Sequence, residues 1–360
     1  MFSEEEKQRY SRHLLLKGFG LEGQEKLKNS KVLLVGAGGL GCPIGLYLAA
    51  AGVGSITVMD FDLVDNSNLQ RQVAFENNDI GLPKAEVLCA RMRELNPHID
   101  VKAKCEALDE SNAMKLFRDH DLIVDGSDNF TTRYLVNDAS YLSKVPLVSA
   151  AVSRYSGQIS VYNLEEESPC YRCLFPHDPA NELTQNCNEA GVLGALVGVM
   201  GSLQAVECLK VLTCTGEVAS GQLITYDMLT NSFNNFKLQK SPSCRLCGPN
   251  ADITKIVPQS VTCTSQEAGL EIEVFEDLYR NGSFKLLDIR EETEFELFPL
   301  KIPAIHIPLS ELKDRLNELD ESQVYCAVCQ FGERARKAHL VLKKAGMKSH
   351  YLTSGMEHIG

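Results

Sequence analysis

The stretch VLLVGAGGLG, residues 32–41, decides how the chain begins to fold. An apolar run leads into Gly36, Gly38 and Gly41 at the spacing G-x-G-x-x-G, and Asp60 closes a second apolar run, SITVMD. In a βαβ unit, such glycines allow a tight turn and a close approach of backbone to phosphate, and the acid binds ribose hydroxyls. The pattern predicts a nucleotide site, but it does not choose between a nicotinamide cofactor and another adenine nucleotide.

Apolar strands and helical segments alternate through the first 125 residues. Ser3 and Glu6 fit a capping box, which predicts a helix close to the start of the chain. Strands are expected at 32–36, 55–60, 99–104 and 121–125, and helices at 21–29, from the glycine turn to about 51, at 83–95 and at 111–118. This order predicts a Rossmann-like, mostly parallel sheet with helices on both faces and ligands beyond the carboxyl ends of its strands.

The pattern changes after residue 145. Strands linked by turns are expected at 146–153, 157–164, 221–228 and 232–239, with one long helix near 191–212, and these strands extend the sheet in antiparallel fashion. The apolar stretch 191–206 is shorter than the roughly 20 residues of a membrane span, so it predicts a buried helix.

A second α/β unit is expected after a linker. Residues 249–266 have few apolar repeats and two prolines, which separates a first domain, 1–248, from a second, 267–360. The second domain is predicted to contain strands at 285–289, 304–308, 323–328 and 350–353 and helices at 273–280, 310–319 and 335–346.

Composition narrows the class of protein. The net charge of −12 argues against a nucleic-acid partner, which needs a basic surface. The N-terminal stretch MFSEEEKQRY is acidic and polar, unlike a signal peptide, so we expect a cytoplasmic protein. Thirteen cysteines, an odd number without an export signal, favour metal binding or thiol chemistry over a disulfide scaffold.

Four of these cysteines form two C-x-x-C pairs about 70 residues apart. The pairs are Cys170–Cys173 and Cys244–Cys247. Four thiolates suit tetrahedral Zn²⁺ with no open position, which is a structural site. We therefore expect a zinc ion that clamps the ends of the antiparallel half together.

Polar residues beyond Asp60 favour ATP over NAD. Asn68 and Arg71 follow in DFDLVDNSNLQRQ, and Lys84 opens the next helix. Two cations beside a glycine turn suit a triphosphate. Asp128, just after a strand end, is placed to hold Mg²⁺ on those phosphates.

The motifs RYSRH, VGAGGLGCP, DFDLVDNSNLQRQ, GLPKAE, DGSDN, CYRC, NEAGVLG and CRLC occur in this order. Together they resemble the adenylyltransferases of the ubiquitin-activating superfamily, over residues 5–248. The nearest branch activates sulfur carriers for molybdopterin and thiamine synthesis. The resemblance implies that Gly39, Asp60, Asn68, Arg71 and Lys84 contact ATP and that Asp128 serves Mg²⁺. It also implies a homodimer, in which Arg12 reaches into the partner subunit's site.

The second unit resembles a rhodanese domain. LLDIRE (286–291) and AIHIPL (304–309) match its opening strands, and Cys329-Gln-Phe-Gly-Glu-Arg334 matches its C-x-x-G-x-R loop. Backbone N–H groups in such a loop stabilise a thiolate or persulfide. Cys326, inside the predicted strand, is expected in the core. By the first resemblance, Cys187 captures or resolves the activated carrier. The other cysteines are expected to be inert: Cys42, Cys89, Cys105, Cys208 and Cys214 on helices or strands, and Cys263 in the linker.

The motifs together imply ATP-dependent adenylation of the C-terminal glycine of a ubiquitin-like sulfur carrier ending in Gly-Gly. Sulfur from a Cys329 persulfide, loaded by a donor such as a cysteine desulfurase, would then give a thiocarboxylate. Two alternatives stay open. An NAD-dependent oxidoreductase shares the glycine fingerprint, and a non-catalytic carrier-binding scaffold needs only the fold.

Overall fold

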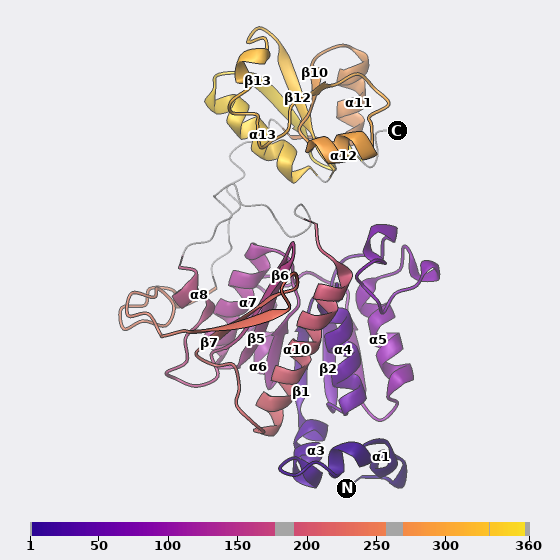
Figure 1. The fold of residues 1–360 in the computed structure, drawn as a ribbon, viewed down its shortest axis with the longest axis vertical. Helices are drawn as coiled ribbons and strands as arrows, with labels where there is room; N and C mark the ends of the chain where they lie inside the picture. Colours follow the sequence, from indigo (N-terminus) through magenta and orange to yellow (C-terminus); the bar gives the residue numbers. More distant parts are fainter. Residues whose placement is uncertain (1, 177–190, 257–268, 331, 357–360) are drawn as a thin grey trace. The chain divides into compact units, whose positions relative to one another are not determined.

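The computed structural model describes residues 2–176, 191–256, 269–330 and 332–356. The chain divides into two compact units, Met1–Gln259 and Ser260–Gly360 (Figure 1). The division falls inside the segment expected as a linker. Each unit has its own sheet and its own core, so each is described by itself.

An eight-stranded sheet organises the first unit, with the strand order β3-β2-β1-β4-β5-β6-β7-β8. The strands are β1 Lys31–Val35, β2 Ser55–Met59, β3 Asp100–Lys104, β4 Leu122–Asp125, β5 Leu147–Ser153, β6 Ser156–Tyr162, β7 Gln222–Asp227 and β8 Ser232–Lys237. Strands β3 to β5 are parallel, and β6 to β8 continue the sheet antiparallel. The predicted fold class is thereby confirmed.

Helices cover both faces of this sheet (Figure 1). The helices described in this unit are α1 Glu4–Arg9, α2 Ser11–Leu14, α3 Gly20–Asn29, α4 Gly41–Ala51, α5 Lys84–Leu95, α6 Ala113–Arg118, α7 Phe130–Ser143, α8 Tyr171–Leu174 and α10 Gly194–Thr213, with 3₁₀ turns at Asn66–Asn68 and Asn77–Asp79. Successive side chains of β1 point to opposite faces of the sheet, and each face has its own core. Val32 and Leu34 pack with α4, α5 and α10, whereas Leu33 and Val35 pack with α6 and α7.

The capping box that predicted α1 is present. The Ser3 hydroxyl accepts the Glu6 N–H, and the Glu6 carboxylate accepts the Ser3 N–H. Helix α7 was not predicted from the sequence. Its buried face carries Arg133, Asn137 and Asp138 beside apolar residues, so the apolar periodicity that marks a surface helix is absent.

By length and composition, α10 is apolar enough to cross a membrane. In the structure it packs against the sheet, with Leu196, Val197 and Met200 in the core shared with α4. Two of its buried polar side chains hydrogen-bond to backbone groups inside the same unit. Gln204 Nε2 donates to the Asp125 carbonyl at 2.8 Å, and Glu207 accepts the Ala219 N–H at 2.9 Å. Helix α10 is therefore a core helix of this unit, as the sequence predicted.

The second unit is a five-stranded parallel sheet with the order β11-β10-β12-β13-β9. Its strands are β9 Gly269–Leu270, β10 Lys285–Asp288, β11 Ile305–His306, β12 Val324–Val328 and β13 Lys348–Leu352, and its helices are α11 Ile272–Arg280, α12 Glu292–Leu297 and α13 Glu333–Lys344. Helices α11 and α13 cover opposite faces, because Phe275 packs with Cys326 and Val328, and Ala338 packs with Ala327.

The prediction of an α-helix at 310–319 is wrong. Only a 3₁₀ turn forms there, Leu316–Glu318, and the N–H groups of Glu311, Asp314 and Glu318 all bond three residues back. The leucines of this segment still reach the core. Their spacing of three and four residues fits successive tight turns as well as an α-helix, so apolar periodicity could not separate the two.

The glycine turn generates a stability prediction. Gly36 has φ +94°, and a Cβ there would lie 2.8 Å from the Gly126 carbonyl oxygen. Gly81 has a similar φ of +86° but nothing within 4 Å. Gly81→Ala should cost about 1 kcal/mol of unfolding free energy for its backbone conformation. Gly36→Ala should cost at least about 3 kcal/mol, because overpacking against backbone is added. Urea unfolding measures both, and equal losses would contradict the close approach.

Candidate functional site

The glycine turn lies where the strand order reverses, between β1 and β4. Gly36 donates to the Met59 carbonyl and Gly126 donates to the Val35 carbonyl, both at 2.8 Å, so the two loops are held at the carboxyl ends of these strands. A Cβ on Gly41 would overlap the Gly36 carbonyl oxygen. Helix α4 can therefore begin directly against the turn, with its N-terminus toward the edge where α/β sheets bind ligands.

Asp60 fixes the backbone on both sides of itself. Its carboxylate accepts the Ala37 N–H at 2.7 Å and the Asp62 N–H at 2.8 Å. Burial raises the pKa of Asp60, and the two N–H donors and nearby Lys84 oppose that rise. The acid predicted to bind ribose also holds the glycine turn in register with β2.

The cations of the site are placed by short contacts. Lys84 Nζ, almost fully buried, lies 2.9 Å from Asp62 Oδ2. Arg71 Nη1 donates to the Ser67 carbonyl at 2.9 Å. Asn68 is buried, and its Oδ1 accepts the Asp65 N–H at 3.3 Å, so it supports this loop from within.

Asp128 stands in a loop that is fixed at both ends. Before it, Ser127 donates through its N–H and its hydroxyl to Asp125 Oδ1, at 3.0 and 2.6 Å. After it, Asn129 caps α7 by accepting the Thr132 N–H at 2.8 Å. Arg133 also donates to the Ser127 carbonyl at 3.1 Å. This bracing restricts where the Asp128 carboxylate can lie.

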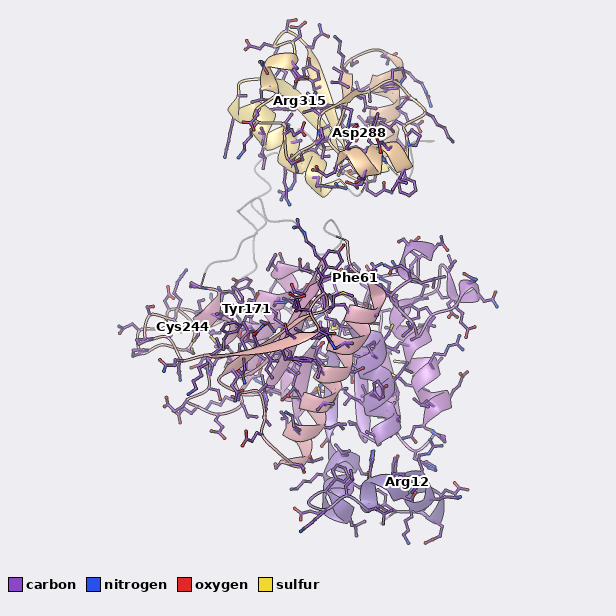
Figure 2. The ribbon with its side chains drawn as sticks, in the orientation of Figure 1. Arg12, Phe61, Tyr171, Cys244, Asp288 and Arg315 are labelled. Carbon is purple, nitrogen blue, oxygen red and sulfur yellow. The ribbon has the colours of Figure 1, made fainter. Side chains whose placement is uncertain are left out.

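These loops enclose one cavity of about 200 Å³ along the carboxyl edge of the sheet. Its lining follows the strand order. Glu106–Leu108 come after β3, Met59 ends β2 and Asp60–Asp62 follow it, Gly36 and Gly38–Leu40 come after β1, Gly126–Asn129 come after β4, and Val152 lies on β5. Phe61 marks this edge in Figure 2. The end near β3 is the most apolar, with Met59, Phe61, Ala107 and Leu108 beside a few acidic side chains, and the glycine turn lies at the centre of the cavity.

Most of the residues predicted for the ATP site meet at this cavity: Gly36, Gly38, Gly39, Asp60, Arg71, Lys84 and Asp128. Gly41 and Asn68 do not line the cavity. They support the loops that form it, through the contact of Gly41 with Gly36 and the hydrogen bond of Asn68 to Asp65. Arg12, on α2, lies at the opposite end of this unit from Phe61 (Figure 2). The sequence interpretation missed Asp62, Gln72 and Arg133, which also line the cavity. The run DFDLVDNSNLQRQ contained two of these, next to residues already selected.

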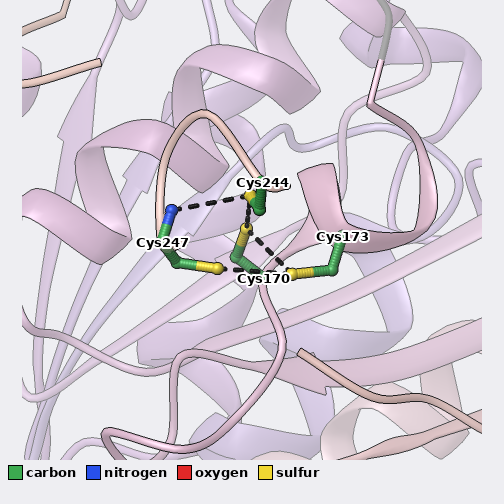
Figure 3. A group of neighbouring side chains, drawn as sticks. All are labelled: Cys170, Cys173, Cys244 and Cys247. Atoms are coloured by element: carbon green, nitrogen blue, oxygen red, sulfur yellow. Dashed lines mark hydrogen bonds between the residues drawn. The ribbon is translucent and has the colours of Figure 1, made fainter. Parts of the chain in front are cut away.

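The four predicted zinc ligands gather into one cluster (Figure 3). Cys170, Cys173, Cys244 and Cys247 bring their sulfur atoms within 4.8 Å of one another. Three of the Sγ–Sγ distances are 3.8, 3.6 and 3.3 Å. Zinc–sulfur bonds of 2.3 Å set the edges of a tetrahedron at about 3.8 Å, so the cluster is close to the size that zinc needs. It lies away from the nucleotide cavity.

The cysteine cluster is tied to α7. Arg172, between Cys170 and Cys173, makes two hydrogen bonds of 2.7 Å to Asp138 on α7. Its guanidinium lies 4.6 Å from the centre of the Tyr134 ring, and Asn137 Oδ1 accepts the Tyr171 N–H at 2.8 Å. Backbone N–H groups of Ser241 and Cys247 donate to the cluster sulfurs Cys173 Sγ and Cys244 Sγ. Such donors stabilise thiolates.

Cys329 follows β12 in the second unit. It is buried, and Ala335 N–H donates to its Sγ at 3.3 Å from the first turn of α13. Gly332 takes φ +85° before that helix, where a Cβ would overlap the Thr353 carbonyl oxygen. Arg334 is buried and forms a two-pronged ion pair with Glu294 of α12. The loop around Cys329 is thereby anchored to α12.

The remaining cysteines divide by exposure. Cys42, Cys89, Cys208 and Cys326 are buried, and burial raises the pKa of each thiol. Cys326 is thus a core residue, as predicted. Cys105 follows β3 and Cys214 ends α10, and both are exposed rather than held within an element. Cys187 and Cys263 lie outside the described residues.

The fold and site define a nucleotide-binding α/β enzyme with a four-cysteine cluster, joined to a small α/β unit with a cysteine loop. The chain belongs to the ThiF family, whose model matches residues 10–246. Residues 271–359 match the rhodanese-like domain. Both resemblances inferred from the motifs are confirmed.

Two similar proteins are named "Adenylyltransferase and sulfurtransferase MOCS3". The one from Drosophila willistoni is 39% identical over 321 residues, covering 85% of this chain and 70% of that protein. The one from Caenorhabditis briggsae is 37% identical, covering 95% and 91%. Among solved structures, E. coli MccB with ATP is 25% identical and has a TM-score of 0.59, covering 66% of this chain and 74% of MccB.

The Glu294–Arg334 pair predicts a pH-dependent stability. Burial alone would raise the pKa of Glu294, but the hydrogen bonds and charge of Arg334 outweigh it and lower that pKa below the ordinary 4.5. The stabilisation is therefore complete above pH 4.5 and is lost as the pH falls through the lowered pKa. Glu294→Gln should destabilise the second unit by about 1–3 kcal/mol at pH 7, and the difference from wild type should shrink at acid pH.

Urea-dependent hydrogen exchange of α13 in the full chain measures this effect. Glu296→Gln changes an exposed carboxylate on α12, the helix that carries Glu294, and should leave the stability within about 0.5 kcal/mol of wild type. A Glu294→Gln deficit that persists undiminished at pH 3 would show that the ion pair is not its cause.

Proposed function

We propose that this chain uses ATP to adenylate the C-terminal glycine of a ubiquitin-like sulfur carrier and then transfers sulfur to the activated carboxyl. The observation that carries this proposal is the single cavity where the glycine turn, Asp60, Arg71, Lys84 and Asp128 meet. The Cys329 loop of the second unit and the names of the two relatives support the sulfur-transfer step. The product would be a thiocarboxylate.

The lining of the cavity suggests how ATP lies in it. The apolar end, with Met59, Phe61 and Leu108, suits adenine, and Asp60 suits the ribose hydroxyls. The phosphates would then lie along the glycine turn, toward Arg71 and Lys84. Asp128 is the carboxylate best placed to hold Mg²⁺ on them. MccB, which shares the fold, has a solved structure with ATP.

Adenylation solves a chemical problem, because a carboxylate is a poor electrophile. A carboxylate oxygen of the carrier attacks the α-phosphorus, the bond to the β-phosphate oxygen breaks, and pyrophosphate leaves with its electron pair. Negative charge builds up on the departing pyrophosphate, and cations that are already in place stabilise it. Arg71 and Lys84 supply them from this chain. We assign Arg12 to the partner subunit's site in a cytoplasmic homodimer, since it lies far from the cavity of its own chain.

The second unit would supply sulfur. A donor of the cysteine desulfurase class loads Cys329 as a persulfide, whose outer sulfur attacks the acyl adenylate and displaces AMP. A thiol, which we assign to Cys187, then attacks the Cys329 sulfur and releases the thiocarboxylate. This leaves a Cys187–Cys329 disulfide that a cellular thiol reductant reopens. The carrier would be of the molybdopterin or thiamine type.

We also assign zinc to the four-cysteine cluster. The chemistry of four sulfurs at this spacing suits Zn²⁺, and a closed four-thiolate site has no position for substrate. Its contribution would be stability, since the pairs join the segment after β6 to the segment after β8.

Pyrophosphate exchange tests the adenylation step. With ATP, Mg²⁺ and a Gly-Gly-ending carrier, labelled pyrophosphate should enter ATP in a carrier-dependent way. Cys329→Ala should keep this exchange within about twofold and abolish thiocarboxylate formation from a persulfide donor, because the two chemistries use different residues. Cys326→Ala is the matched thiol control and should retain sulfur transfer. An NAD-dependent oxidoreductase or a non-catalytic scaffold predicts no exchange, and normal sulfur transfer by Cys329→Ala would refute the rhodanese role.

Metal analysis tests the cluster. Wild type should bind one zinc per chain, and Cys244→Ser should lose zinc and melting temperature together, because structural zinc binding is coupled to folding. Cys214→Ser removes an exposed thiol and should change neither quantity. If a zinc-free preparation melts like wild type, the structural role is refuted.

A further inference from the structure

Gln72 is a polar residue of the cavity to which the proposed function gives no task. It is 4% exposed and lines the cavity beside Arg71. Among the described residues, its buried Oε1 has no hydrogen-bond partner. An unpaired buried amide oxygen costs about 1–3 kcal/mol, so it calls for an explanation.

The backbone holds Gln72 in place above the glycine turn. Its N–H donates to the Asn68 carbonyl at 2.9 Å, and its own carbonyl accepts the Phe75 N–H at 3.1 Å. Its Nε2 lies 3.7 Å from the position that a Cβ on Gly38 would take. The terminal amide torsion of glutamine is soft. Either amide atom can therefore turn toward a ligand in the cavity.

A ligand that satisfies Gln72 must offer both a donor and an acceptor. ATP phosphates offer acceptors only, so they would leave Oε1 unpaired. Adenine and ribose carry donors, but their proposed places lie toward β2 and β3, with Asp60 for the hydroxyls. In an extended chain, the N–H and C=O of one residue point the same way, so together they match the two ends of a side-chain amide. The amide is also neutral, so it does not repel the carboxylate that must react.

We propose that Gln72 binds the N–H and C=O of the penultimate glycine of the sulfur carrier and so positions the terminal carboxylate for attack on the α-phosphate. This assignment rests on the proposed adenylation. It makes Gln72 a substrate-positioning residue that acts on the carrier, in contrast to Arg71 and Lys84, which act on ATP. The unpaired oxygen of the free protein is then the price of a site prepared for its second substrate.

The test pairs a side-chain change with a change in the carrier. Gln72→Met keeps the length and removes both hydrogen-bonding atoms. The probe is a recombinant ubiquitin-like carrier ending in Gly-Gly, compared with a semisynthetic copy in which an ester replaces the amide that carries the N–H of the penultimate glycine. In pyrophosphate exchange, Gln72→Met should raise the KM for the carrier about tenfold and leave the KM for ATP unchanged. The ester should weaken wild type by a similar factor and add little to Gln72→Met.

Gln70→Met is the matched control, because Gln70 is exposed two residues earlier and does not line the cavity. It should behave as wild type with both carriers. A wild type that treats ester and amide carriers alike overturns the proposal, and this comparison needs no variant to fold. Equal increases in both KM values for Gln72→Met also overturn it. Wild type without carrier-dependent exchange is a different failure, which refutes the proposed adenylation itself.

Discussion

The first unit depends on a close approach of backbone to backbone at the ends of β1 and β4. Gly36 meets Gly126 and Gly41 at distances that leave no room for a side chain. This contact lets α4 begin directly behind the turn, and it brings the loops that carry Asp60 and Asp128 to one edge of the sheet. Hydrogen bonds then preserve the arrangement, since Asp60 binds the turn and Asp125 binds the loop before Asp128. The cavity thus exists because side chains are absent at these glycines, and hydrogen bonds hold its loops in place.

The structure separates residues that hold the site from residues that face its ligands. Asn68 and Asp125 are buried, and their side chains accept hydrogen bonds from neighbouring loops and strands. Arg71, Lys84 and Asp128 line the cavity. Because the supporting contacts come from different strands, the positions of the facing groups are set by the sheet as a whole. Preorganisation of this kind lowers the cost of assembling charges around a reacting phosphate.

Local sequence patterns predicted much of this molecule. The G-x-G-x-x-G spacing predicted β1, its turn and α4, and the C-x-x-C pairs predicted a cluster that the fold closes over 74 residues. Buried polar residues were harder. Helix α7 was missed because Arg133, Asn137 and Asp138 lie on its buried face, and their partners come from other elements. Gln72 was missed for the same reason, since its environment exists only after the loop has folded. The segment 310–319 shows that leucine spacing fixes burial without fixing the kind of turn.

Helix α7 joins two parts of the first unit that do different work. Its first residue follows Asn129, next to Asp128, and further along the helix Asp138 grips Arg172 inside the Cys170–Cys173 loop. Fourteen residues of helix form a stiff rod of about 21 Å. The cysteine cluster can therefore affect the position of groups outside its own loops. If the cluster loosens, Asp138 loses its partner Arg172 and α7 is held less firmly. The N-terminus of the same helix supports the loop that carries Asp128, so the cavity is affected as well.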